Sequence, residues 1–283
     1  MAFFWLPDRT ISFMKSRLFT QLQYLLTLRV TQAQIEKWSR ETKIFFILAQ
    51  GRSGTAFLAD LLNQSQNSHV CHEPVFEDLN AYVKAYYSPQ AAENYMQRFR
   101  KKEIYLRMWH IPTSVYGEVN SILRRHANAI KSAFPDATLI HLVRDGREVV
   151  RSMISRTTMT EKDRISTKIH PVKSDPWRNQ WDQMDRFSRL CWYWQTENAY
   201  LRTTLNKTVQ FDKILANYDY FHNEILRPCH IDIGQEIWAR AIASPRNATD
   251  MYHMPKWADW TSEQQEIFKN ICGDEMVKSG YVF

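Results

Sequence analysis

Two short clusters of small and basic residues in this sequence could bind anions. The first lies at residues 50–55 and reads Gln50-Gly51-Arg52-Ser53-Gly54-Thr55. Its glycines permit a tight loop, Arg52 carries a permanent charge on a forked set of donors, and Ser53 and Thr55 add hydroxyl donors. This composition predicts a loop that binds a phosphate or a sulfate.

The elements expected on either side of this loop strengthen that prediction. Residues 44–49 are an apolar run typical of a buried strand. Apolar residues after the loop recur at helical spacing, at Phe57, Leu58, Leu61 and Leu62. A helix that begins near Gly54 would direct free backbone N–H groups and the positive end of its dipole at an anion. The ATP-type loop G-x-x-x-x-G-K-[ST] is excluded, because residues 50–55 contain no lysine.

The second cluster begins where another apolar run, residues 138–143, ends in Arg144. Val149, Val150, Met153 and Ile154 then form the apolar stripe of a helix. Ser152 follows Arg144 by eight residues and lies two turns into this helix. Two basic strand ends in one sheet imply two anionic groups on one ligand, or two ligands.

The order of the remaining segments predicts an α/β fold. After the first helix, strands are expected at residues 69–74, 103–111 and 138–143. Helices are expected between them, at residues 77–100 with a restart at Pro89, and at residues 115–132. Strands separated by helices predict a mainly parallel central sheet flanked by helices, in a single domain over residues 1–283. Ligands of such sheets bind at the carboxyl ends of the strands.

The composition limits the class of ligand. A net charge of +7 suits nucleic acid, a membrane surface or a small polyanion, but the basic residues are mixed with acids, so nucleic acid is disfavoured. The four cysteines contain no C-x-x-C pair and are expected to be reduced core thiols in a cytoplasmic protein, with no metal site; they are Cys71, Cys191, Cys229 and Cys272.

Residues 1–40 are expected to form an amphipathic helical extension. The longest uncharged run, residues 18–28, is too short to span a bilayer, and no signal-peptide pattern is present. The extension could pack on the domain, contact a membrane peripherally, or join two copies as a homodimer. Packing on the domain is the favoured prediction.

The two anion-binding clusters together resemble those of the sulfotransferase family, which uses 3′-phosphoadenosine 5′-phosphosulfate (PAPS). Residues 50–55 are similar to the family's loop for the 5′-phosphosulfate. Residues 142–156 are similar to its 3′-phosphate segment, with the same interval of eight between Arg144 and Ser152, in a form close to protein-tyrosine and Golgi-type members. A weaker similarity continues at residues 208–215. The resemblance implies a P-loop-like sulfotransferase fold, here of a soluble bacterial type.

This resemblance assigns residues to the co-substrate PAPS and implies no metal. The residues implied to bind PAPS are Gly51, Arg52, Ser53, Gly54, Thr55, Ala56, Arg144 and Ser152. The family also covers the nucleotide with a loop near the C-terminus. Residues 244–257 are the stretch suited to that role, with Arg246 and Asn247 as the expected contacts and Lys256 behind them.

The resemblance leaves two candidates for the general base. Family members use a Glu beyond the first helix or a His at the end of the next strand, and Glu73 and His110 match these positions. His72 is a weaker candidate, because its side chain should point away from that of Glu73 if the strand continues. Arg52 is expected to act as an electrophilic clamp, since arginine does not deprotonate.

The acceptor of the sulfuryl group is open. An alcohol, a phenol, an amine or a carbohydrate would fit the chemistry, and the absence of a Golgi-type anchor favours a small molecule. Residues 157–190 are expected to serve as a lid or substrate loop. Two other functions are weighed: a nucleotide-dependent phosphotransferase of P-loop-like fold, and a non-catalytic basic module for RNA or lipid.

Overall fold

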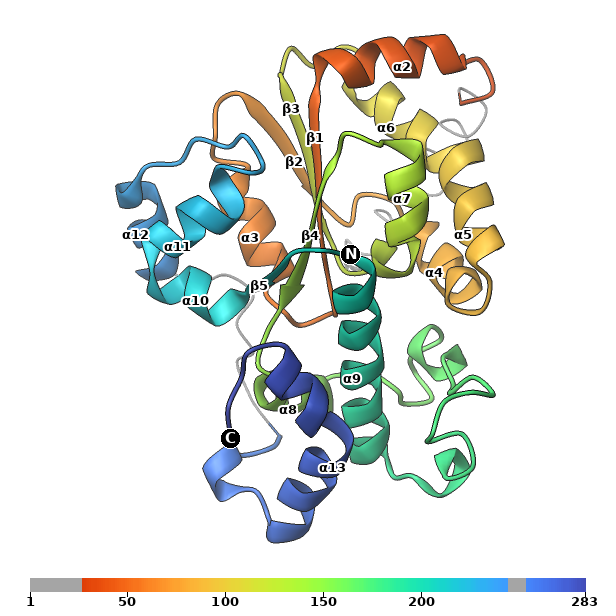
Figure 1. Cartoon of the computed structure of the whole chain (residues 1–283), viewed down its shortest axis with the longest axis vertical. Coiled ribbons are helices and arrows are strands. Elements are labelled where there is room, and N and C mark those ends of the chain that lie inside the picture. The colour runs from red at the N-terminus through yellow and green to blue at the C-terminus, as the bar shows by residue number, and fades with distance from the viewer. Residues whose placement is uncertain (1–26, 244–252) are drawn as a thin grey trace, which may run out of the picture.

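The computed structural model describes residues 27–243 and 253–283, and a five-stranded parallel sheet forms its centre (Figure 1). The sheet has the order β2-β3-β1-β4-β5, and every pair of neighbours is parallel. Its strands are β1 (Lys43–Ala49), β2 (Ser68–His72), β3 (Val115–Asn120), β4 (Thr138–Val143) and β5 (Thr208–Gln210). The predicted α/β class with a mainly parallel sheet is confirmed.

Helices cover both faces of this sheet. In chain order they are α2 (Gln32–Glu41), α3 (Thr55–Leu62), α4 (Asp78–Tyr87), α5 (Pro89–Tyr95), α6 (Lys101–Met108), α7 (Ala127–Ala133), α8 (Gly146–Ile154), α9 (Arg186–Thr204), α10 (Phe211–Ala216), α11 (Tyr218–Phe221), α12 (Gln235–Ala243) and α13 (Ser262–Lys278). The predicted helix restart at Pro89 is confirmed, because Ser88 caps α5 by accepting a hydrogen bond from the N–H of Ala91.

Strand β1 shows how the sequence separates the two faces. Phe45, Ile47 and Ala49 point into the apolar core shared with α3, α10 and α11. The alternate residues Ile44, Phe46 and Leu48 point into a second core with α2, α5, α6 and α7. Because both faces are covered, β1 reads as a continuous apolar run rather than an alternating one.

Two sequence predictions between β2 and β4 are wrong. Residues 103–111 were expected to form a strand, but Lys101–Met108 is helix α6. The helix buries Ile104 and Met108, which are four residues apart and lie on the same helical face. The strand begins instead at Val115, inside the segment expected to be helical, and the predicted helix is confined to Ala127–Ala133 with a 3-10 turn before it.

The predicted N-terminal extension lies mostly outside the described residues. Within residues 27–40 the structure shows α2, which begins with a capping box between Thr31 and Gln34 and buries Ile35 against the second core. Residues 1–26 are not described. No helix in residues 27–243 or 253–283 is long and apolar enough to cross a membrane.

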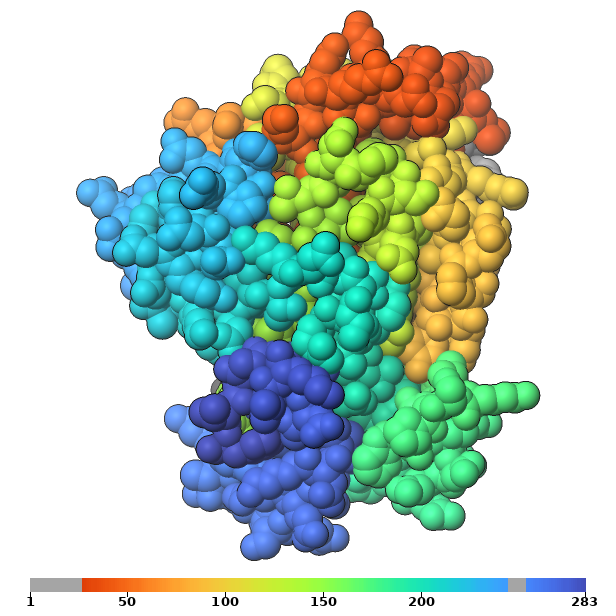
Figure 2. Space-filling view, viewed as in Figure 1, coloured from red at the N-terminus to blue at the C-terminus, as the bar shows by residue number. Residues whose placement is uncertain are grey.

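The carboxyl ends of the strands are bordered by α8, α9, α13 and the segment before α9 (Figure 1). In the space-filling view, α13 and the segment before α9 form the lower end of the molecule (Figure 2). That segment, residues 155–185, contains only short 3-10 turns. Arg186 fastens it to the end of α8 by donating to the carbonyl oxygens of Met153, Ile154 and Thr158. The hydroxyl of Tyr87 adds a hydrogen bond of 2.7 Å to the carbonyl oxygen of Lys168.

Candidate active site

The two predicted anion-binding segments lie side by side in the structure. Strands β1 and β4 are neighbours, and Ala49 is in register with Leu142, so the chain leaves both strands at the same edge. The sheet order also reverses here, since the chain continues from β1 toward β2 and β3 on one side while β4 lies on the other. Such a switch point is where α/β sheets bind their ligands.

Residues 50–55, named here the anion loop, have a backbone that only a glycine fits at one position. Gly54 has a φ of 87°, and a Cβ atom there would lie 2.2 Å from the ring of Phe211. Arg52 also has a positive φ, of 73°. Helix α3 begins at Thr55, directly after this turn, as the sequence predicts. Its first N–H groups therefore face the carboxyl edge of the sheet.

Hydrogen bonds join the anion loop to the segment after β4. The Nε of Arg52 donates to the hydroxyl of Ser152 on α8, at 3.0 Å. The Nη1 of Arg144 donates to the carbonyl oxygen of Arg52, at 3.3 Å. The structure therefore brings together three residues that the resemblance assigned to two phosphate positions.

This junction contains buried polar atoms without a hydrogen-bond partner among the described residues. They are the Oε1 of Gln50, the Oγ of Ser53 and the Nε of Arg144. A buried polar group that lacks a partner costs about 1–3 kcal/mol, so native proteins leave few of them. Three such atoms around one loop are consistent with a polar ligand that completes their hydrogen bonds.

The polar groups at the start of α8 form hydrogen bonds and an ion pair within the protein. Asp145 caps the helix by accepting from the N–H of Arg147 at 2.9 Å, and its carboxylate pairs with the Arg147 guanidinium. The N–H of Asp145 donates to Asp212, which also accepts from the hydroxyl of Tyr281 at 2.8 Å. Asp145 and Arg147 therefore hold the turn that presents Arg144.

Glu73 lies at the carboxyl end of β2, on the same edge of the sheet. Its φ of 45° is in the left-handed region, which costs a residue with a Cβ atom about 1–2 kcal/mol. Its Oε1 accepts from the N–H of Ser121 at 3.2 Å and also from the Ser121 hydroxyl. Ser121 directly follows β3, so the neighbouring strand end holds this carboxylate in place.

His72 lies beside both Glu73 and the anion loop. Its Nε2 is 3.0 Å from the Thr55 hydroxyl oxygen and 3.7 Å from the Oε1 of Glu73. The sequence argument placed the two side chains on opposite sides of a continuing strand. The condition of that argument is not met, because β2 ends at His72 and the next residue, Glu73, has a left-handed backbone conformation.

The structure does not bring His110 to this edge. His110 follows α6 in an exposed turn, and the next strand begins at Val115, which pairs with Lys43 at the amino end of β1. The anion loop follows the other end of that strand, about 20 Å away for a strand of seven residues. The prediction that His110 ends a strand beside the anion loop is therefore wrong.

The predicted cover loop is described only in part. Arg246 and Asn247 lie outside the described residues. Where the described chain resumes, the N–H of His253 donates to Ser155 at 2.9 Å and the carbonyl oxygen of Met254 accepts from Arg151. The chain therefore returns along α8, the helix that carries Ser152, and Lys256 is exposed just beyond.

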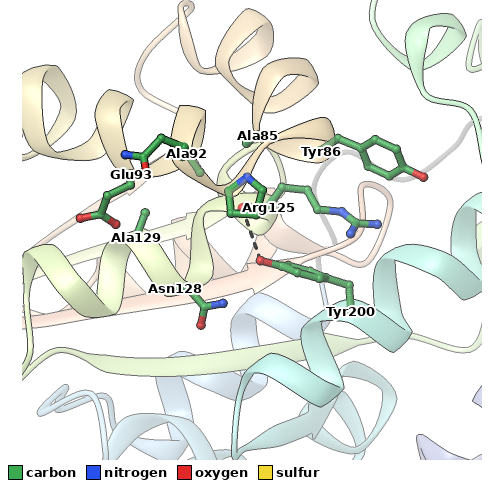
Figure 3. Close-up of a pocket in the computed structure, with 10 residues that line it drawn as sticks. Ala85, Tyr86, Ala92, Glu93, Arg125, Asn128, Ala129 and Tyr200 are labelled. Atoms are coloured by element: carbon green, nitrogen blue, oxygen red, sulfur yellow. Dashed lines mark hydrogen bonds between the residues drawn. The ribbon is translucent and has the colours of Figure 1, made fainter. Parts of the chain in front are cut away.

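A separate pocket of about 350 Å³ lies between helices rather than at the strand ends (Figure 3). Arg125 lies between the rings of Tyr86 and Tyr200, at 4.5 and 4.3 Å from their centroids. Its guanidinium also pairs with buried Glu197, at 3.0 Å. The charge in this pocket is thus paired at hydrogen-bond distance, whereas the nearest carboxylate oxygen to Arg144, of Glu148, is 3.9 Å away.

No group of three or more His, Cys, Asp or Glu side chains suited to a metal ion occurs among residues 27–243 and 253–283. The four cysteines, which lie in this part of the chain, are free.

Comparisons with known proteins agree with this class of fold. A model of the sulfotransferase family matches residues 112–233 of this chain. The match covers β3, β4, Arg144 and Ser152. No curated protein sequence matches the chain.

Two solved structures share the fold at low sequence identity. Sulfotransferase STF9 from Mycobacterium avium is 11% identical, with a TM-score of 0.54, and the match covers 98% of this chain and 86% of that one. Sulfotransferase STF1 from Mycobacterium tuberculosis H37Rv is 12% identical, with a TM-score of 0.51, over 93% of this chain and 86% of that one. Both support the P-loop-like sulfotransferase fold.

Sequence reasoning missed Ser121 and Phe211 at this site. Ser121 would have been found had residues 115–120 been recognised as a strand, because polar residues just after strands were the signal used elsewhere. Phe211 covers Gly54 and lies 5.8 Å from the Arg144 guanidinium. An aromatic residue at a strand end gives no comparable signal in the sequence.

Proposed function

We propose that this protein transfers a sulfuryl group from PAPS to a hydroxyl or amine of a small-molecule acceptor. The observation that carries the proposal is the junction of Arg52, Arg144 and Ser152 with three unpaired buried polar atoms around it. A ligand with two separated anionic groups would satisfy both segments at once. PAPS is such a ligand, with a phosphosulfate at one end and a 3′-phosphate at the other.

The proposed binding mode assigns one end of the nucleotide to each segment. The anion loop and the first turn of α3, including Ala56, would hold the 5′-phosphosulfate through backbone N–H groups, hydroxyls and Arg52. Arg144 and Ser152 would hold the 3′-phosphate. Arg246 and Asn247 stay proposed contacts of the nucleotide.

Bound PAPS would supply the sulfuryl group and a phosphate leaving group. We assign Glu73 as the general base that takes the proton of the acceptor hydroxyl or amine. As the new bond to sulfur forms and the bond from sulfur to the bridging oxygen breaks, negative charge grows on the leaving phosphate. Arg52 and the α3 N–H groups face that charge and would stabilise it more strongly in the transition state than in the ground state.

The arrangement around Glu73 supports its role as the base. Ser121 binds only the Oε1 atom, which leaves the Oε2 atom for an acceptor. Phe76, three residues along the chain, is 47% exposed and would offer apolar surface to such a molecule. A hydroxyl compound or amine with an apolar part fits this setting.

The direct test is an assay with PAPS and a mixture of alcohol, phenol and amine acceptors, with mass spectrometry to detect sulfated product. Binding is tested separately with the desulfonated nucleotide PAP. At one hundred times its Kd, PAP should stabilise the fold by about 2.7 kcal/mol. Stabilisation by Mg·ATP with none by PAP would instead indicate a phosphotransferase.

A further inference from the structure

We propose that His72 is a positioning residue that links the anion loop to the base-bearing turn and orients the Thr55 hydroxyl toward the bound anion. This inference rests on the proposed function and extends it to a residue that the family resemblance does not assign. It arises from one contact, the 3.0 Å distance between the Nε2 of His72 and the Oγ1 of Thr55.

The contact joins the ends of two strands that do not pair with each other. Thr55 opens α3 after β1, whereas His72 ends β2, and β3 lies between these strands in the sheet. Both strands pair with β3, so the sheet holds their ends two strand spacings apart, or about 10 Å. The side chain of His72 bridges that gap.

The hydroxyl of Thr55 gains a defined direction from this partner. A hydroxyl has one donor and two acceptor positions and rotates to suit its neighbours. When the His72 nitrogen donates to Thr55, the single O–H of Thr55 is free to donate elsewhere, and its residue lies at the start of the helix that faces the anion. When that nitrogen accepts, the same O–H is used within the protein. We infer that the donating form of His72 is the one that supports anion binding.

The turn at Glu73 places the carboxylate beside the imidazole of His72, so that this imidazole lies between Glu73 and Thr55. The left-handed φ of 45° brings the carboxylate to the same side as His72, and the Nε2 atom lies 3.7 Å from the Glu73 Oε1. Ser121 holds that oxygen from the other direction. His72 thus lies between the residue that would meet the donor and the residue that would meet the acceptor.

A double-mutant cycle on PAP binding tests the link. His72→Ala and Thr55→Val should each weaken PAP binding by about five- to tenfold, the equivalent of one directed hydrogen bond. If His72 acts through Thr55, His72→Ala should have no further effect in the Thr55→Val background. His72→Gln, whose amide nitrogen can donate from nearly the same place, should restore most of the affinity.

The control is His110→Ala, which removes an exposed histidine at the opposite edge of the sheet and should leave PAP binding unchanged. Full additivity of His72→Ala and Thr55→Val, or equal binding of PAP by His72→Ala and the unmodified protein, would overturn the inference. A failure of His72→Gln to rescue would contradict the donating role.

The proposed function can fail separately from this inference. If the unmodified protein binds no PAP, the nucleotide assignment is wrong, and the same cycle is then measured with inorganic phosphate, which needs only the anion loop. Non-additive loss of phosphate binding in the two variants would support the His72–Thr55 link without PAPS. Additive losses, or none, would reject it.

Discussion

Two buried charged regions of this protein differ in how their charges are satisfied. Around Arg100, the guanidinium binds three carboxylates, at Asp78, Glu103 and Glu118, and all four side chains are fully buried. At the carboxyl edge of the sheet, Arg144 has a buried Nε without a partner among the described residues, and its nearest carboxylate oxygen, of Glu148, is 3.9 Å away.

This difference indicates that the charges around Arg100 stabilise the fold, whereas those at the strand ends are placed to bind a ligand. The Arg100 cluster joins α4, α6 and β3 and is closed to solvent, so its partners are already present in the fold. The strand-end site combines unpaired polar atoms with two non-glycine residues at positive φ, Arg52 and Glu73. Backbone strain and unmet hydrogen bonds in one place are typical of sites that wait for a ligand.

The largest effect is expected from removal of the proposed base. Glu73→Gln keeps the size of the side chain and removes its basicity, so turnover with PAPS should fall by about 10²- to 10⁴-fold. PAP binding should stay within a factor of about three, since the carboxylate is assigned to the acceptor rather than the nucleotide. Steady-state kinetics and calorimetry measure the two quantities. Near-normal turnover would remove Glu73 as the base.

The Arg100 cluster should respond in stability instead of activity. Arg100→Met leaves three buried carboxylates without their cation, and the free energy of unfolding should fall by about 3–5 kcal/mol. Arg98→Met, an exposed arginine in the same π-helical turn, is the matched control and should change it by less than about 0.5 kcal/mol. Urea denaturation measures both. A loss of PAP affinity in folded Arg100→Met would contradict the purely structural role assigned to the Arg100 cluster.

Arg144→Ala should reverse this pattern, with a loss of binding and little loss of stability. A charge-assisted hydrogen bond contributes about 1.5–3 kcal/mol, so PAP affinity should fall roughly 10- to 100-fold. Affinity for AMP, which lacks the 3′-phosphate, should not change. Calorimetric titration with both nucleotides checks this. Equal losses for PAP and AMP would mean that Arg144 does not contact the 3′-phosphate.

The smallest expected effect is a pH dependence of the Arg100 cluster. Burial raises the pKa of Asp78 from 3.8 to about 7, with nearby Glu118 acting in the same direction and Arg100 opposing it. Because the folded state holds this proton more tightly than the unfolded state, Asp78 favours folding below about pH 4, and that contribution is lost as pH rises through 7.

Asp78→Asn removes that titration. Between about pH 4 and 7, the unmodified protein should lose at least about 1.4 kcal/mol of stability relative to Asp78→Asn, the equivalent of one pKa unit. Melting temperatures of the two proteins over this pH range measure the difference. Parallel curves would show that Asp78 is ionised throughout.

The sequence predicted those parts of the fold whose signals are local. The strand before the anion loop, the turn at Gly54 and the helix after it follow from an apolar run, small residues and helical spacing. The segment from Arg144 to Ser152 follows in the same way. These elements contain most of the residues of the proposed nucleotide site.

The parts that sequence reasoning missed depend on distant partners. Strand β3 carries Glu118 at its centre, a residue unfavourable for a buried strand, and its partner Arg100 comes from a separate helical turn. Because the sequence does not show this partner, residues 115–120 were predicted to be part of a helix of mixed polarity. The wrong position of the strand also placed His110 at a strand end and left Ser121 unrecognised as a residue that follows a strand. The left-handed turn at Glu73, which brings His72 to the site, has no signature in the sequence either.

The central claim is that the two strand-end segments form a single site for a nucleotide with two anionic ends. One measurement tests this claim most directly. The unmodified protein is titrated with PAP and with AMP under identical conditions. The account predicts that PAP binds roughly 10- to 100-fold more tightly, because only PAP presents a 3′-phosphate to Arg144 and Ser152. Equal affinities, or no binding of PAP, would contradict it.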